Sequence, residues 1–439
     1  MKSTTQQLIA VLALATALSA HAAPEVKVTA ALGRPVLQAD EKQTTYLKVA
    51  LTGFASTIME RRTPVNVALV LDRSGSMAGE KLRKAKEAAM MAIDRLNEND
   101  IVSVVAFDDQ VQVLVPATKV SDRAAIRAAI ERLQPGGSTA IFAGVSKGAA
   151  EVRKFLDRER MNRVILLSDG IANVGPCSPS DLGELGSSLI KERISVTTIG
   201  LGADFNEDLM TQLARQSDGN HGFAENAGDL ARLFNAEFGD ILSVVAQEVT
   251  VRIRFETGFR PVRALGRDAD ITGQNVTVRL NQLYAEQEKF VMLEVEAPAL
   301  AAGRRSAVAK VDVTYANMAT HRSDQHTATV SAVYEASAQR VRDNENVSVM
   351  TGAIELIGVD NNKRALALRD AGKVAEAKSA LIYNGGFLSE NATRYNAPKL
   401  KEYGATNDAQ SKQLDESSWN MNRKGMKKDQ YSREGQQSY

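Results

Sequence analysis

The chain has 439 residues, of which 44% are hydrophobic and 24% charged, and its 54 basic and 53 acidic residues leave a formal net charge of +1. This length predicts two or three globular domains, and the near-zero charge argues against nucleic acid as a partner, because binding phosphates requires a basic face. The single cysteine, Cys177, excludes an intrachain disulfide framework and cysteine-rich metal sites.

The amino terminus has the pattern of a secretory signal peptide. Lys2 precedes the apolar stretch Leu8–Leu18, and Ala20 and Ala22 supply the small residues that a signal peptidase reads. The apolar stretch is short for a membrane span. We therefore expect residues 1–22 to be removed, no transmembrane span in the mature chain, and a protein that is periplasmic, on the cell surface or secreted.

The next segments predict strands of two different kinds. Residues 23–62 contain Val26–Thr29 and Tyr46–Leu51, where apolar and polar residues alternate as in half-buried strands. The apolar run Val65–Leu71 is followed by a Ser/Gly turn and a helical stretch, Glu80–Leu96. A strand buried on both faces and followed by a helix is typical of a parallel α/β sheet. Because this alternation repeats, residues 63–244 are predicted to form one doubly wound domain.

Residues 245–335 alternate at period two between turn residues, which predicts a β-sandwich. The N-terminal strands have no sheet of their own, so we expect them to pair with this sandwich and the α/β domain to be an insertion. Residues 338–402 regain a helical period, with a glycine stop at Gly372 between two helices. The fold class predicted is α/β, with an additional β-sandwich and a short C-terminal helical region.

Residues 403–439 are rich in Gln, Ser, Asn and Lys and have almost no apolar period, which predicts a disordered tail. This tail contains the basic cluster Arg423–Lys428. Two interpretations of the cluster stay open, namely a solvated segment or a weak electrostatic contact with anionic lipid or polymer of the cell envelope.

Polar side chains gather where strands of the predicted α/β domain end. Asp72, Ser74 and Ser76 follow the first strand, Thr139 ends a glycine-containing loop before a helix, and Asp169 follows the buried strand at Val164–Leu167. The carboxyl ends of parallel strands meet at one edge of the sheet, where ligands of open α/β folds bind. Carboxylate and hydroxyl oxygens suit a hard cation.

These loops resemble those of the von Willebrand factor A (vWA) family, in which Asp-x-Ser-x-Ser, Thr and Asp elements build a metal-ion-dependent adhesion site (MIDAS). The resemblance implies a Rossmann-like vWA domain over residues 63–244 and a bound Mg2+, with Mn2+ or Ca2+ as alternatives. It also implies that Ser74 and Ser76 ligate the cation directly, Thr139 directly or through water, and Asp72 and Asp169 through water. The chain is more distantly similar to inter-alpha-trypsin inhibitor heavy chains.

The functional prediction is a non-enzymatic, divalent-metal-dependent protein-binding module for adhesion or assembly in the cell envelope. Mg2+ prefers six oxygens, so a partially filled site leaves room for an Asp or Glu side chain of a partner protein, beside a rim formed by residues 171–179. The alternative is a structural component of an envelope assembly with metal-independent contacts.

Other candidate residues have simpler interpretations. An enzyme is disfavoured, because the mature chain offers only His221, His321 and His326 as imidazole bases and none lies in a catalytic motif. We expect His221 to be structural and the other two histidines to lie on the surface in a turn. Cys177, in a loop, is either a free thiol or the site of an intermolecular disulfide.

Overall fold

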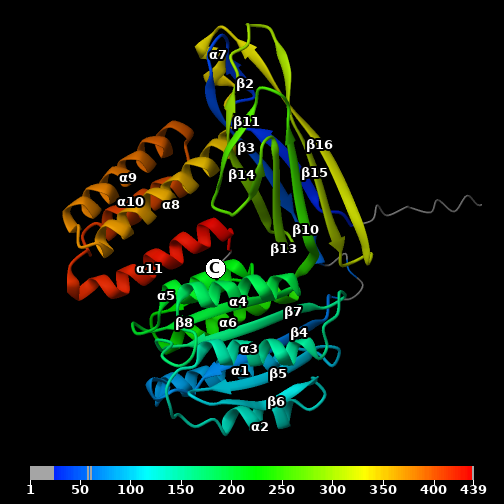
Figure 1. The fold of residues 1–439 in the computed structure, drawn as a ribbon, viewed down its shortest axis with the longest axis vertical. Coiled ribbons are helices and arrows are strands. Elements are labelled where there is room, and N and C mark those ends of the chain that lie inside the picture. Colours follow the sequence, from blue (N-terminus) through cyan, green and yellow to red (C-terminus); the bar gives the residue numbers. More distant parts are fainter. Residues whose placement is uncertain (1–23, 57–58, 60–61, 438–439) are drawn as a thin grey trace, which may run out of the picture.

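The computed structural model describes residues 24–56, 59 and 62–437, and the predicted signal peptide lies outside these ranges. An α/β domain occupies one end of the elongated molecule, a β-sandwich occupies the other, and a group of C-terminal helices lies along one side (Figure 1). Within the described ranges, no helix combines the length and the apolar character needed to cross a bilayer.

The α/β domain is built on a six-stranded sheet with the order β6-β5-β4-β7-β8-β9, in which β6 alone is antiparallel to its neighbour. Its strands are β4 (Val65–Asp72), β5 (Ile101–Phe107), β6 (Val111–Lys119), β7 (Met161–Ser168), β8 (Ile194–Leu201) and β9 (His221–Ala224). Every residue of β4, β5, β7 and β8 is buried. This double-sided burial explains the continuous apolar runs in the sequence.

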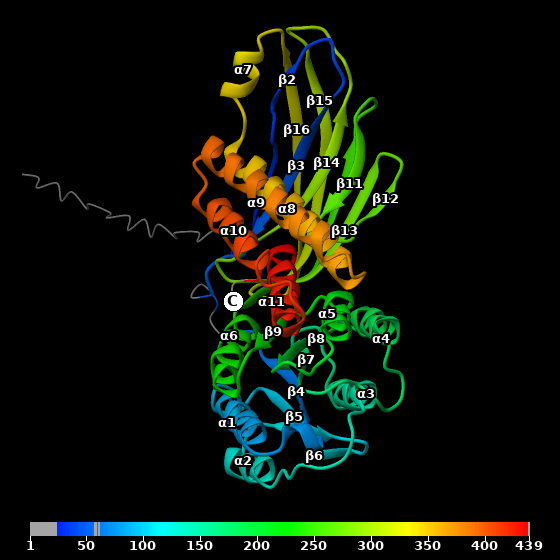
Figure 2. The same ribbon diagram turned by 90° about the vertical axis from the view of Figure 1, so that its left-hand side faces the viewer.

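Helices cover both faces of this sheet, as Figure 2 shows. One face packs against α1 (Glu80–Asp94), α2 (Arg123–Glu131) and α6 (Leu230–Leu242). The other face packs against α3 (Ile141–Arg153), α4 (Pro179–Lys191) and α5 (Glu207–Gln216). The predicted α/β fold class, doubly wound around a mainly parallel sheet, is confirmed.

The sandwich consists of two sheets with the strand orders β1-β3-β14-β11 and β12-β13-β10-β15-β16-β2, and their facing side chains form a separate apolar core. Its strands are β1 (Lys27–Leu32), β2 (Val36–Gln38), β3 (Gln43–Thr52), β10 (Val244–Phe255), β11 (Arg260–Leu265), β12 (Asp270–Thr272), β13 (Asn275–Tyr284), β14 (Glu288–Ala297), β15 (Arg305–Asn317) and β16 (Arg322–Glu335). The N-terminal strand β3 pairs along its whole length with β14. The chain therefore leaves the sandwich to form the α/β domain and then returns to it.

The C-terminal region is mainly helical as far as Gly435. It comprises α7 (Ala338–Asp343), α8 (Val347–Asp370), α9 (Val374–Tyr395), α10 (Pro398–Gln410) and α11 (Glu416–Gly435). The prediction of a disordered tail from residue 403 is wrong. Helix α11 lies between the other C-terminal helices and the α/β domain in both views (Figures 1 and 2).

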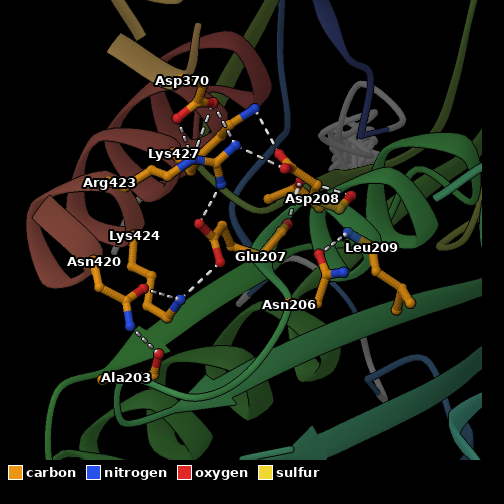
Figure 3. A network of polar contacts seen from close by, with 11 residues as sticks. Ala203, Asn206, Glu207, Asp208, Leu209, Asp370, Asn420, Arg423, Lys424 and Lys427 are labelled. Carbon is orange, nitrogen blue, oxygen red and sulfur yellow. Dashed lines mark hydrogen bonds and ion pairs between the residues drawn. The ribbon is translucent and has the colours of Figure 1, made fainter. Parts of the chain in front are cut away.

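Ion pairs hold α11 against α5, which explains why a polar segment can be ordered. Lys424 Nζ lies 2.8 Å from Glu207 Oε2, and Lys427 Nζ lies 2.8 Å from Asp208 Oδ1. Arg423 contacts both carboxylates and also Asp370 at the end of α8 (Figure 3). Three of the four basic side chains of the cluster are thus paired within the molecule.

Candidate functional site

Two adjacent parallel strands bring the predicted carboxylates together. Strands β4 and β7 are paired in register, with Leu71 opposite Leu167. Asp72 is the last residue of β4, and Asp169 follows the last residue of β7. Both carboxylates are fully buried at the same edge of the sheet, as expected for residues that follow neighbouring parallel strands.

A continuous series of hydrogen bonds connects four of the five predicted site residues. The backbone N–H of Ser74 donates to Asp72 Oδ1 at 2.7 Å, and the hydroxyl oxygens of Ser74 and Ser76 lie 3.0 Å apart. The Ser76 hydroxyl donates to Asp169 Oδ1 at 2.7 Å. Ser76 is exposed to solvent whereas the other three are buried. The cluster is therefore open on the side of Ser76.

Thr139 approaches the cluster from a third loop. A Cβ atom built on Gly170 would lie 2.8 Å from Thr139 Oγ1, so the hydroxyl sits directly against the residue that follows Asp169. The side chain of Asn173 accepts a hydrogen bond from the Thr139 N–H at 2.8 Å and fixes the loop. Within the described ranges, the Thr139 hydroxyl makes no hydrogen bond to the other four site residues.

A glycine is required in this third loop. Gly137 has φ +68°, and a Cβ atom there would lie 2.0 Å from Asp109 Oδ1 and 2.8 Å from the Cβ of Asp108. Its carbonyl accepts a hydrogen bond from the Gly75 N–H at 3.1 Å, which ties the loop to the serine loop. A turn at residues 108–110 joins β5 to β6, and Asp108 pairs with Arg73 at 2.9 Å.

Sequence reasoning assigned no role to two further residues at the cluster. The hydroxyl of Ser168, at the end of β7, donates to Asp72 Oδ2, and the ammonium of Lys81, in the first turn of α1, pairs with Asp169 Oδ2. Ser168 could have been noticed from its place directly before Asp169. Lys81 carries no local signal, because only the packing of α1 on the sheet brings it to β7.

Burial controls the electrostatics of the cluster. Desolvation raises the pKa of Asp72 to about 6, although hydrogen bonds from Ser168 and Ser74 act in the opposite direction. A buried carboxylate of this kind is stabilised in its charged form by a nearby cation. Lys81 supplies one positive charge to Asp169, and a metal ion would supply more.

The remaining candidates lie in other environments. His221 is buried in β9, where its Nδ1 lies 2.8 Å from the Thr198 hydroxyl and burial lowers its pKa to about 3. His321 lies in the turn between β15 and β16, as predicted, but His326 lies within β16, stacked on Tyr315. Cys177 is a free, exposed thiol. No group of three His, Cys, Asp or Glu residues is placed to hold a metal in the part of the chain that the structure describes.

Comparison with known proteins identifies the α/β domain. Residues 66–236 match the family described as von Willebrand factor type A domain. A protein of Synechocystis sp., described as uncharacterized, is 31% identical over 266 residues, which cover 58% of this chain and 62% of that protein. The human inter-alpha-trypsin inhibitor heavy chain H3 is 32% identical over 170 residues, which cover 37% of this chain and 19% of the heavy chain. The chain thus spans less than two thirds of the length of either relative.

Solved structures extend the likeness beyond the α/β domain. A von Willebrand factor type A protein from Catenulispora acidiphila superposes with a TM-score of 0.71 at 18% identity, covering 89% of both chains. The ArnB paralog VWA2 from Sulfolobus acidocaldarius superposes with a TM-score of 0.64 at 17% identity, covering 93% of this chain and 97% of the other. The chain therefore contains a von Willebrand factor type A domain with the Rossmann-like fold expected from its sequence.

Proposed function

We propose that this chain, which carries a von Willebrand factor type A domain, is a non-enzymatic, divalent-metal-dependent protein-binding module of the cell envelope. The proposal rests on the hydrogen-bonded cluster of oxygens at the carboxyl ends of β4 and β7. Asp72 and Asp169 are buried, whereas Ser76 is exposed to solvent. A site built in this way can hold a cation and still present one side of it to a partner.

The residues present fit a hard divalent cation. The donor set consists entirely of carboxylate and hydroxyl oxygens, the atoms that Mg2+ prefers. Ser74, Ser76 and Thr139 would hold the ion directly, or Thr139 through water, and Asp72 and Asp169 would hold it through water. The ion would supply Lewis acidity toward an Asp or Glu side chain of the partner. Mn2+ and Ca2+ accept the same oxygen ligands.

Asp169 can serve the cation and Lys81 at the same time, because its two oxygens face different groups. Oδ1 accepts the hydrogen bond from Ser76, whereas Oδ2 pairs with Lys81. The ammonium therefore removes part of the negative charge of the site without taking the oxygen next to the serine loop. A less negative site leaves a bound cation more attractive to an acidic side chain of a partner.

The rim beside Asp169 offers an apolar contact that would add affinity and specificity. Ile171 is 59% exposed in the loop that follows Asp169. This apolar side chain lies next to the polar cluster, where a partner bound at the cluster would cover it. In this proposal the partner presents a carboxylate to the ion and an apolar residue to Ile171.

The predicted signal peptide supports placing this module outside the cytoplasm, in the periplasm, on the cell surface or in the medium. An enzymatic function has less support, because His221 is buried among structural contacts in β9 and the other two described histidines belong to the sandwich.

A pull-down of envelope proteins with residues 23–439 tests the proposal. The bait is compared in Mg2+, in EDTA, and as Asp169→Ala in Mg2+. Asp157→Ala serves as the matched control, because Asp157 is an exposed aspartate in the loop before β7, at the opposite end of that strand. A partner retained only by wild type and the control in Mg2+ would support the proposal. A partner retained in all samples would favour the alternative, a structural component with metal-independent contacts.

A further inference from the structure

A second candidate site lies where the three parts of the molecule meet. A cavity of about 210 Å³ is lined by residues of α5 and the turn before β9, by residues of the sandwich, and by the end of α11. Asn220 in its wall directly precedes β9. The cavity therefore lies at the amino ends of the parallel strands, away from the edge that carries Asp72 and Asp169.

Lys289 is the unusual residue of this cavity. It lies on β14 and is 5% exposed, and it lines the cavity. Its ammonium has no hydrogen bond or ion pair within the described ranges, and it lies 4.8 Å from the centroid of the Tyr284 ring. Burial lowers the pKa of this ammonium to about 8. Asp218 and Asp240 attract this ammonium only from a longer distance, and no carboxylate of the described residues forms an ion pair with it. A buried cation without a contacting anion is costly.

A second donor in the same wall is also unsatisfied. The Nε–H of Arg267 is buried and has no acceptor. The other end of this guanidinium is occupied, with Nη2 donating to the Gly435 carbonyl at 3.1 Å and Nη1 lying 3.4 Å from Asp218 Oδ1. Lys289 and Arg267 thus offer the cavity an ammonium and an N–H group that the protein itself does not use.

The acidic residues of the wall form no ion pair with Lys289 among the described residues, although Asp218 attracts its charge from a longer distance. Glu434 pairs with Arg215, which also lines the cavity, and with Lys363, which does not. Asp218 accepts a hydrogen bond from the Asn281 N–H at 2.5 Å and also faces Arg267. Asp268 is exposed, and so is the basic residue Arg279. Four basic and three acidic side chains line the cavity, so its net charge is +1.

We propose that this cavity binds a small oxyanion, of the phosphate or carboxylate type, through the ammonium of Lys289 and the Nε–H of Arg267. The anion supplies a directly contacting counter-charge for Lys289 and an acceptor for Arg267. Because α11 contributes Tyr431 and Glu434 to the wall, the bound anion also ties this helix to the sandwich and to the vWA domain. The site is independent of the proposed metal function.

Calorimetric titration of residues 23–439 with inorganic phosphate and with malonate, in EDTA and at constant ionic strength in chloride, tests this proposal. EDTA removes any contribution from the metal site. We expect saturable binding of at least one oxyanion, with the two titrations distinguishing phosphate from carboxylate. Thermal unfolding in the same buffers should show a higher Tm with the anion that binds.

Two variants make the test specific. Lys289→Met should weaken binding at least tenfold, whereas Lys48→Met should leave it unchanged. Lys48 is a matched control because its ammonium also lies over an aromatic ring, that of Phe290 at 4.6 Å, but is paired with Glu288. Arg267→Gln provides a second site variant. Absence of binding by both anions to wild type, or equal binding by wild type and a folded Lys289→Met, would overturn the proposal.

Discussion

The ion pair between Glu207 and Lys424 should contribute strongly to the docking of α11 on the vWA domain. Lys424 Nζ lies 2.8 Å from Glu207 Oε2, and the two side chains are 3% and 7% exposed. The ammonium also contacts the Asn420 side-chain oxygen at 3.0 Å and lies 4.8 Å from the centre of the Phe205 ring. Glu207→Gln keeps the shape of the side chain but leaves a buried ammonium without its carboxylate.

We expect Glu207→Gln to destabilise the docked helix by about 3 kcal/mol, the order of magnitude for breaking a buried pair by removing one partner. The double variant Glu207→Gln/Lys424→Met removes both charges, so most of this loss should be recovered. In every variant Arg423 continues to hold α11 in place, because it also pairs with Asp208 and Asp370.

The only tryptophan of the chain, Trp419, lies in α11 with its ring 5.0 Å from the Arg369 guanidinium. Its fluorescence during urea titration therefore reports unfolding of α11 together with its packing on α8, which loss of the Glu207 contact should make easier. Glu87→Gln on α1 is the control, because the Arg83–Glu87 pair is 56% and 43% exposed and contributes little to stability in solvent. The reasoning is refuted if Glu207→Gln lowers the free energy of unfolding no more than this control does, or if the double variant is as unstable as Glu207→Gln alone.

Three further predictions concern the metal site and pH. Mg2+ at about a hundredfold above its Kd should stabilise the vWA domain by roughly 2.7 kcal/mol in a thermal unfolding assay, and an equal shift in Asp72→Ala would contradict the site. Lys81→Met removes the positive charge beside Asp169, so Mg2+ should bind several-fold more tightly by calorimetry, and unchanged or weaker binding would count against the assigned geometry. Burial lowers the pKa of His221 to about 3, below its unfolded value, so its contribution to stability falls as the pH drops below about 6.5, by about 2 kcal/mol at pH 5. The stability difference between wild type and His221→Gln should shift by this amount between pH 8 and pH 5, and parallel pH profiles would refute the assignment.

Much of the site could be predicted from the sequence, because its residues are tied to strand ends. The apolar run Val65–Leu71 is buried on both faces, and such a run must be a central strand whose last residue, Asp72, reaches the sheet edge. The same reasoning places Asp169 beside it. Lys81 could not be predicted, since its contact with Asp169 depends on how α1 packs across the sheet. That these oxygens hold a metal stays a prediction.

Before residue 403, the local sequence pattern by itself determined most of the strands and helices. A segment that buries one face shows apolar residues at regular spacing, and a segment buried on both faces shows a continuous apolar run. Only the tertiary structure determined that the C-terminal segment is ordered and helical. Its composition is polar, and in isolation it buries too little apolar surface to offset the entropy of ordering. Arg423 and Lys424 become ordered because Glu207 lies against them, although it precedes them by 216 and 217 residues in the chain. A pairing over that separation leaves no local pattern, and it exists only once the vWA domain has folded.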